Sequence, residues 1–261
     1  MNIQPLDQSA VVLAGSSAGI ALEIACQLAE AGVPKLMLNG RDPAKAEAAL
    51  ATVRGRAPNC DVRFTAADVS RAADGKRLID ETHAAFGRVD VLVNSIGGVM
   101  NPRPFHELDP SDFPRLLNGH ILSVLHTCHA VLPYMIAQGG GAIINLGSDA
   151  GKVPTPGEAI IGGCKAAVLM FSRTLAMENG RHGVRVNCIL PSLVKDTPLY
   201  DKVMAEPFSK KLFEKAMRRQ HLGTTTPRDI APMVVLLASP AGANISGQGI
   251  SINGGLSAAL G

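Results

Sequence analysis

A serine, a glutamate and a lysine lie close together in the middle of the chain, at Ser148, Glu158 and Lys165. Together they could hold a carbonyl oxygen, exchange a proton and supply a positive charge. Glu158 precedes Lys165 by seven residues, so both side chains project from one face if the segment is a helix. Burial would raise the pKa of Glu158, whereas Lys165 and a helix start would lower it. We therefore expect an exposed glutamate and keep proton donation as the second interpretation.

A glycine-rich turn near the start of the chain could bind phosphate. The apolar segment 10–15 runs into AGSSAGIA, where Gly15 permits a tight turn and Gly19 lets a pyrophosphate approach the backbone. The backbone around Ser17, Ala18 and Ile20 would then face the phosphates at the positive end of the next helix. A strand before this turn and a helix after it predict a dinucleotide site.

Short apolar runs alternate with amphipathic stretches along the whole chain. The runs are apolar at consecutive positions, which is typical of parallel strands covered on both faces. We expect strands at 10–15, 35–40, 62–69, 89–97, 141–148, 184–191 and 249–255, and helices at 19–31, 43–54, 71–86, 111–136, 157–180 and 227–238. The sequence therefore predicts one doubly wound α/β domain of about seven strands over residues 1–261. Residues 198–222 interrupt this alternation, and we expect them to form a substrate lid.

Several motifs, in order along the chain, resemble those of the short-chain dehydrogenase/reductase family. AGSSAGIA is similar to that family's T-G-x-x-x-G-I-G loop, and VNSIG stands where its members usually have N-N-A-G. NCILPSLVKDT is similar to N-x-x-x-P-G-x-x-x-T, with Ser192 in place of the glycine. The resemblance implies a Rossmann-type fold and a cofactor site that includes Asp68, Val69, Asn94, Ser95, Gly97, Lys165, Pro191, Val194 and Thr197.

The same resemblance implies hydride transfer between a nicotinamide and a carbonyl or carbinol carbon. It assigns catalytic roles to Asn118, Ser148 and Lys165, and it leads us to expect a tyrosine at the position of Ile161. Isoleucine cannot move a proton. An oxidoreductase of this type would need another donor, such as Glu158, Tyr200 or a held water; alternatively, the chain binds cofactor without turnover, or less readily acts as a lyase or isomerase.

Three histidines and a cysteine lie near these positions in the sequence. His120 comes two residues after Asn118 and could line the site, while His126 and His129 have no acidic or cysteine partner at a metal-ligand spacing. We therefore expect no metal. Cys164 points about 100° away from Lys165 on a helix and is expected to pack in the core.

The end of the second predicted strand bears on the choice of cofactor. A carboxylate there would accept hydrogen bonds from the ribose of NAD, whereas a basic group suits the 2′-phosphate of NADP. The chain has no acid at Asn39 or Gly40, and Arg41 follows. We expect NADP, with NAD possible because Asp42 is adjacent; otherwise Arg41 is a solvated residue before a helix that Asp42 caps.

Composition limits the partners and the compartment. The net charge is +3 without a long basic run, which gives no indication of nucleic-acid binding. Five scattered cysteines favour a reducing cytoplasm. The chain has no run of about 18 apolar residues, so we expect no membrane span. Apolar residues of the loops after the strands favour a small-to-medium carbonyl or alcohol substrate: Met100, Phe105, Leu199, Met204 and Phe208. The broad apolar faces of helices 111–136 and 157–180, with the resemblance, imply a homodimer or homotetramer.

Overall fold

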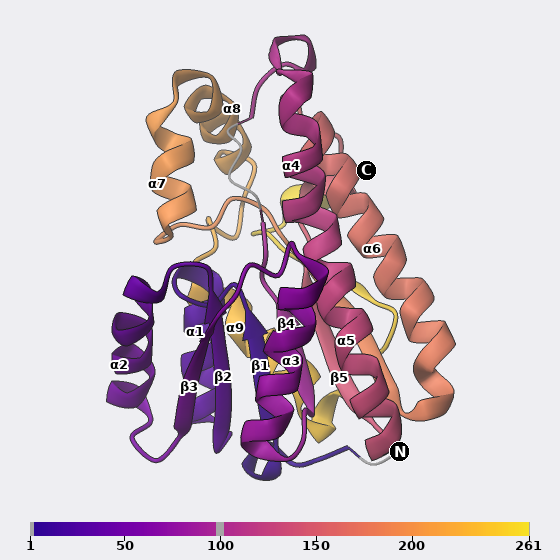
Figure 1. Ribbon diagram of the computed structural model, residues 1–261. Coiled ribbons are helices and arrows are strands. Elements are labelled where there is room, and N and C mark those ends of the chain that lie inside the picture. The colour runs from indigo at the N-terminus through magenta and orange to yellow at the C-terminus, as the bar shows by residue number, and fades with distance from the viewer. Residues whose placement is uncertain (1–2, 98–101, 261) are drawn as a thin grey trace.

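A seven-stranded parallel sheet forms the centre of the computed structural model, which describes residues 3–97 and 102–260 (Figure 1). The strand order is β3-β2-β1-β4-β5-β6-β7, so the chain moves outward from β1 in both directions. The strands are β1 (Ala10–Ala14), β2 (Lys35–Gly40), β3 (Asp61–Ala66), β4 (Val91–Asn94), β5 (Gly141–Leu146), β6 (Val184–Pro191) and β7 (Gly249–Ile252). This confirms the predicted doubly wound fold. Several strands end before their predicted boundaries, because the residues beyond them form the loops of the site.

Helices cover both faces of the sheet. One face carries α1 (Gly19–Glu30), α2 (Ala46–Arg56) and α9 (Pro227–Ala238), and the other carries α3 (Ala72–Phe86), α5 (Ser123–Gln138) and α6 (Ala159–Asn179). Successive residues of β1 explain why its run is apolar throughout. Val11 and Leu13 pack against the helix layer of α1, α2 and α9, while Ala10 and Val12 pack against the layer of α3, α5 and α6. All four are fully buried. Each layer is thus a separate core that shares the sheet.

Two predicted helix starts are capped as expected. The Asp42 carboxylate accepts a hydrogen bond from the Ala44 amide (3.0 Å), although the first turn, Pro43–Lys45, is a 3-10 helix that precedes α2. Thr226 and Asp229 form a reciprocal capping box at the start of α9. These caps satisfy amides that the helices leave without partners.

The long helix predicted at 111–136 is divided. It consists of α4 (Phe113–Leu117), a π-helical turn at Asn118–Leu122 and α5. The wider turn adds a residue to the helical repeat and rotates the side chains that follow it. Within this turn His120 is buried (4% exposed), whereas Asn118 is exposed.

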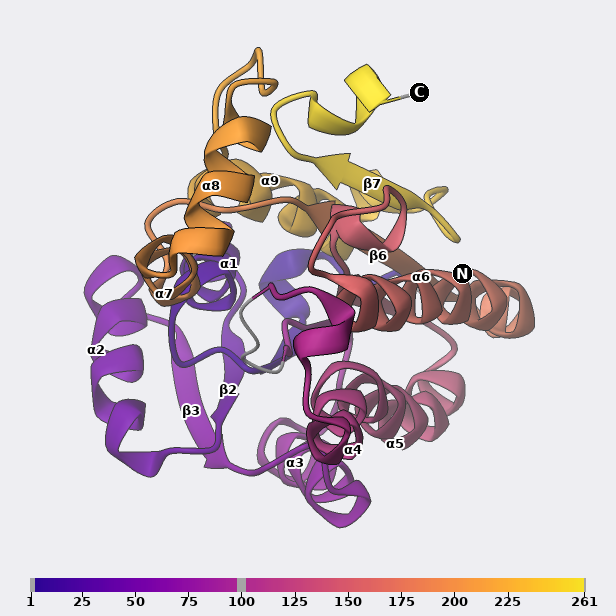
Figure 2. The same cartoon turned by 90° about the horizontal axis from the view of Figure 1, so that it is seen from above.

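The predicted lid is formed by two helices, α7 (Pro198–Ala205) and α8 (Pro207–Met217). They stand above the carboxyl ends of the strands, and α7 lies over the start of α1 (Figure 2). A small apolar cluster of Leu193, Val203 and Phe213 joins both helices to the loop after β6. The cluster is separate from the two main cores, so the lid packs as a unit of its own.

Two segments, Pro110–Gln138 and Ala159–His182, are long and apolar enough to resemble membrane spans by composition alone. One side of each packs on the sheet as part of the second core, which is ordinary for a core helix. The other side leaves apolar residues exposed, among them Met170 and Met177 of α6.

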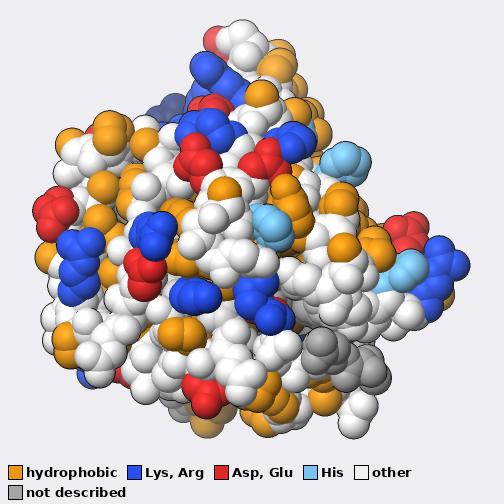
Figure 3. All heavy atoms as spheres, turned by 60° about the horizontal axis from the view of Figure 1, so that its bottom comes forward, with side chains coloured by type: hydrophobic (Ala, Val, Ile, Leu, Met, Phe, Trp, Pro, Cys, Tyr) orange, Lys and Arg blue, Asp and Glu red, His pale blue; other side chains and the backbone are white. Residues whose placement is uncertain are grey.

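On the face shown in Figure 3, positive and negative side chains are interspersed without a field of one sign.

Candidate functional site

The turn between β1 and α1 is held in one conformation by buried hydrogen bonds. The Asn39 side chain accepts a hydrogen bond from the Gly15 amide (3.2 Å), and the Ser16 hydroxyl donates to the Leu13 carbonyl (2.8 Å). Gly15 has φ +77°, and a β-carbon there would lie 2.7 Å from the Ser95 carbonyl oxygen. Only glycine fits this position, as the sequence predicted. The stabilising roles of Ser16 and Asn39 were not predicted, because they depend on pairing between β1 and β2.

The geometry of this turn fits a dinucleotide. Helix α1 begins at Gly19, and neither a side-chain cap nor an acidic residue occupies its first turn. The first amides of α1 are therefore available to an anion. Gly19 faces Thr197, to which a β-carbon on the glycine would come within 3.7 Å. The loops after β1 and β6 thus form opposite walls of a narrow cradle, and a pyrophosphate would lie between them.

A cavity of about 590 Å³ extends from this cradle to the lid. Residues that line it include these eleven from the predicted cofactor and catalytic set: Gly15, Ala18, Gly19, Ile20, Ser95, Gly97, Ser148, Lys165, Pro191, Val194 and Thr197. They come from loops far apart in the sequence that meet where the parallel strands end.

Six predicted site residues do not line this cavity. Ser17 and Arg41 lie towards the ends of β1 and β2, and Asp68 and Val69 follow β3, where the predicted adenosine end of a dinucleotide would lie. Asn94 is fully buried and donates to the Asn145 side chain (2.9 Å), so its part is structural. Asn118 is exposed and outside the cavity, and its predicted catalytic role has no support from this placement.

His120 occupies the place that the sequence led us to expect for Asn118. It lines the cavity, and its ring lies beside Gly97, where an added β-carbon would be 3.7 Å from the imidazole. Both residues lie in the π-helical turn, and only His120 of the two faces the cavity. From the sequence His120 was only a second candidate, because periodicity cannot reveal a π-helical turn.

Lys165 reaches the cavity from within α6 and is 7% exposed. Its ammonium donates hydrogen bonds to the carbonyl oxygens of Leu146 (3.0 Å) and Ile96 (3.3 Å), which fix it at the ends of β5 and β4. Burial lowers the pKa of Lys165. The two carbonyl groups compensate part of the cost of burying the charge.

Ser148 lies two residues beyond β5, at the start of a 3-10 turn. Its hydroxyl oxygen accepts a hydrogen bond from the Ala150 amide (3.2 Å), which leaves the hydroxyl hydrogen free to donate. The neighbouring Asp149 is buried and accepts hydrogen bonds from Ser251 (3.1 Å) and from the Asn253 amide. Residues of β7 and the turn after it therefore hold the serine loop in place.

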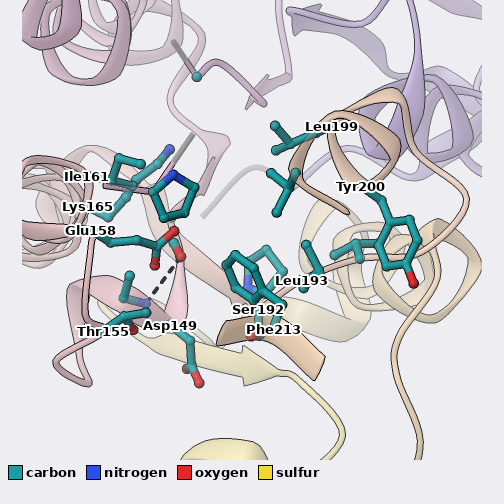
Figure 4. Close-up of a pocket in the computed structure, with 18 of the residues that line it drawn as sticks. Asp149, Thr155, Glu158, Ile161, Lys165, Ser192, Leu193, Leu199, Tyr200 and Phe213 are labelled. Carbon is teal, nitrogen blue, oxygen red and sulfur yellow. Dashed lines mark hydrogen bonds between the residues drawn. The ribbon is translucent and has the colours of Figure 1, made fainter. Parts of the chain in front are cut away.

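Glu158, Ile161 and Lys165 follow one another along the cavity side of α6 (Figure 4). Glu158 is half-buried at the helix start, and its carboxylate points into the cavity. Burial raises the pKa of Glu158 to about 7, and neither Lys165 nor any other charge of the described residues opposes that shift. The expectation of an exposed glutamate is therefore wrong. Pro154 and Pro156 of the preceding loop line the same cavity.

Neither tyrosine lies where the expected phenol would be. Tyr134 is half-buried on α5, and its hydroxyl donates to Asp80 (2.9 Å), away from the cavity. Tyr200 lines the cavity on the lid side, across from Lys165 (Figure 4). Ile161 itself presents only hydrocarbon to the cavity.

The predicted substrate contacts are partly brought together. Leu199 lines the cavity, and Met204 packs on the apolar cluster of the lid. Phe105 and Phe208 do not line it and are more than 40% exposed, at 56% and 44% respectively. Met100 lies outside the described residues. Cys164 is buried, as predicted.

Comparison with known proteins gives likenesses over nearly the whole chain. A family model described as enoyl-(acyl carrier protein) reductase matches residues 14–257. The 3-oxoacyl-[acyl-carrier-protein] reductase of Staphylococcus aureus is 32% identical over 254 residues, which are 96% of this chain and 98% of the relative. The crystal structure of levodione reductase superposes with a TM-score of 0.91 and 28% identity, covering 97% of this chain and 98% of that one. A short-chain type dehydrogenase/reductase from Mycobacterium ulcerans gives a TM-score of 0.88 and 25% identity, covering 98% and 91%.

Proposed function

Since the chain belongs to the short-chain dehydrogenase/reductase family of NAD(P)-dependent oxidoreductases, we propose that it interconverts a carbonyl compound and its secondary alcohol with NADP(H), and that Glu158 takes the place of the missing tyrosine. The observation that carries this proposal is the Glu158 carboxyl, which points into the same cavity as Lys165 and the phosphate loop with a pKa of about 7. A general acid is most effective when its pKa lies near the working pH.

Each residue has a distinct task in this proposal. A bound nicotinamide would supply a hydride to the carbonyl carbon or accept one from the carbinol carbon. The Ser148 hydroxyl accepts from the Ala150 amide and donates its hydrogen to the substrate oxygen. Glu158 gives its proton to that oxygen as negative charge develops, and takes it back in the reverse direction. The Lys165 ammonium supplies positive charge beside the reacting atoms.

The preference for NADP rests on the end of β2. The Asn39 side chain is committed to Gly15, and a β-carbon at Gly40 would lie 3.2 Å from Ser17, so neither position can offer a carboxylate to a ribose. Arg41 is exposed beside them, and Asp42 is engaged as a helix cap. We expect Arg41→Ala to weaken NADPH binding by about tenfold or more and to leave NADH binding unchanged. Calorimetric titration of both cofactors measures this, and equal losses for the two would contradict the assignment.

The decisive experiment compares Glu158→Gln with the wild type. We expect reduction of a carbonyl panel by NADPH to fall by about a hundredfold or more, with the NADPH affinity kept. Glu178→Gln, an exposed glutamate near the far end of α6, is the matched control and should retain full activity. Unchanged turnover in Glu158→Gln would refute the role of this carboxyl.

Ile161 favours a second candidate, a cofactor-binding protein without turnover, because it lines the cavity with hydrocarbon at the position where the resemblance leads us to expect a tyrosine. Two results together would replace the first proposal with this one. The wild type would bind NADPH tightly without turning over any carbonyl or alcohol tested, and Ile161→Tyr would make the protein active.

We further propose a homodimer or homotetramer in the cytoplasm. Met170 and Met177 on α6 are 59% and 87% exposed, which is costly for apolar side chains on a free surface. All five cysteines are free and buried, as suits a reducing compartment. Light scattering of the purified protein would show one chain per particle if the assembly were absent.

A further inference from the structure

One face of the lid helix α8 lines the cavity, and it is positively charged at its carboxyl end. Lys215 and Ala216 follow Leu212 by three and four residues, so the three share one side of the helix, and Arg219 lies in the turn that follows α8. All four line the cavity, whereas Lys211, Glu214 and Arg218 do not. The buried Phe213 joins α8 to the lid cluster and so fixes which side faces inward.

The two positive charges have no acidic partner in the part of the chain that the structure describes. Over residues 3–97 and 102–260, no carboxylate lies within ion-pair distance of Lys215 or Arg219. Many other arginines of the described chain are paired, for example Arg56 with Glu23 and Arg88 with Asp90. The two carboxylates that line the same cavity do not pair with these cations either. Asp149 accepts hydrogen bonds from Ser251 and Asn253, and Glu158 lies at the start of α6.

The lid cluster gives the cavity an apolar stretch of wall, and the uncharged Ser192 and Tyr200 also line the cavity. Leu193, Val203 and Phe213 line it, and no charged side chain of the described residues interrupts them. A ligand that fills this part of the cavity therefore needs an uncharged body, with a hydrogen-bond acceptor at one end and an anion at the other. Ionised groups of opposite sign form the strongest hydrogen bonds at such a rim, and arginine suits a carboxylate in particular.

We propose that the substrate is a carbonyl acid, with an apolar body and a carboxylate that Lys215 and Arg219 bind. This rests on the oxidoreductase function proposed above and adds the class of its substrate. Binding of the acid would draw α8 towards the cavity and close the lid over the reacting carbonyl. A phosphate of the cofactor is the other anion that could reach these cations, and the experiment separates the two.

The test uses two probe pairs that differ only in charge: 4-acetylbenzoate with its methyl ester, and 5-oxohexanoate with its methyl ester. We expect the wild type with NADPH to prefer each acid over its ester by about tenfold or more in kcat/KM. The double variant Lys215→Met, Arg219→Gln should lose that preference by a higher KM for the acid, with the ester unaffected. The matched control, Lys211→Met with Arg218→Gln, removes two charges from the same segment outside the cavity and should behave as the wild type.

Three outcomes would overturn the proposal. The wild type could treat acid and ester alike, the control could lose the preference as fully as the test variant, or the test variant could weaken NADPH binding instead of acid binding, which would assign the cations to the cofactor. If neither acid nor ester is turned over, the proposed reaction fails separately. Calorimetric binding of the acids to the NADP-loaded wild type and test variant then decides the anion site: affinity lost only in the variant supports it, and equal affinity refutes it.

Discussion

Replacing Glu158 with glutamine should change how the stability of the protein depends on pH. Burial raises the pKa of this carboxyl from 4.5 to about 7. Between these two values the folded protein holds a proton that the unfolded chain has released, so the free energy of unfolding falls as the pH rises through this window. Glutamine does not titrate, and the variant lacks this contribution. The wild type should therefore lose stability relative to the variant towards neutral and alkaline pH.

The size of the effect follows from the two pKa values. One unit corresponds to about 1.4 kcal/mol, and a pH change from about 5 to about 8 crosses most of the window. The wild type should lose up to about 2.5 kcal/mol relative to Glu158→Gln over this range, an upper value because the carboxyl keeps some contact with water. Lys165, whose pKa burial lowers, is present in both proteins, so its contribution cancels in the difference.

Urea unfolding of both proteins at the two pH values, without cofactor, measures the difference. Glu178→Gln again serves as the control, because it removes an exposed carboxyl of the same helix that lies away from the cavity. Parallel stability curves for the wild type and Glu158→Gln would show that Glu158 has an ordinary pKa. The proposed proton donor would then lose its physical basis, whatever the activity of the variant.

Two further substitutions test the elements that position the site. Gly15→Ala forces a left-handed residue and a β-carbon 2.7 Å from the Ser95 oxygen, so we expect about 1–3 kcal/mol lower stability together with lost NADPH binding. Gly87→Ala, with φ +78° but open space around it, should lower the melting temperature with NADPH binding intact, and a similar binding loss there would contradict the cradle. Asn253→Ala removes a hydrogen bond from the buried Asp149 and should cost about 2 kcal/mol or more in urea unfolding, against about 1 kcal/mol for the half-buried Ser251→Ala. Equal costs would mean that Asp149 does not depend on Asn253.

The sequence predicted the strands and the phosphate turn well because both are local patterns. Consecutive apolar residues mark buried parallel strands, and Gly15 had to be glycine for a reason that the turn itself contains. The family resemblance supplied Ser148 and Lys165, which line the cavity as expected. Residues 198–222 were expected to form a lid, and the sequence did not show the two helices that they contain.

The errors share a different cause: they depend on how distant segments pack. His120 lines the cavity and Asn118 does not, and the π-helical turn that contains both is not visible in an apolar pattern. Glu158 was expected to be exposed because its burial at the cavity arises only when distant segments come together in the folded chain. The inward direction of Lys215 and Arg219 follows from the packing of Phe213 with Val203, which join two lid helices that the sequence presented as one segment.

Ser251 of β7 and Asn253 just after it donate hydrogen bonds to Asp149. The position of the serine loop therefore depends on an edge strand of the sheet. Among the described strands, β7 pairs with β6 alone, and the border of a sheet opens more readily than its middle. Ser148 would therefore lose its alignment in brief openings that leave both cores intact. The proposed cofactor cradle thus rests on the central strands, whereas the order of the proposed reacting hydroxyl depends on an edge strand, β7.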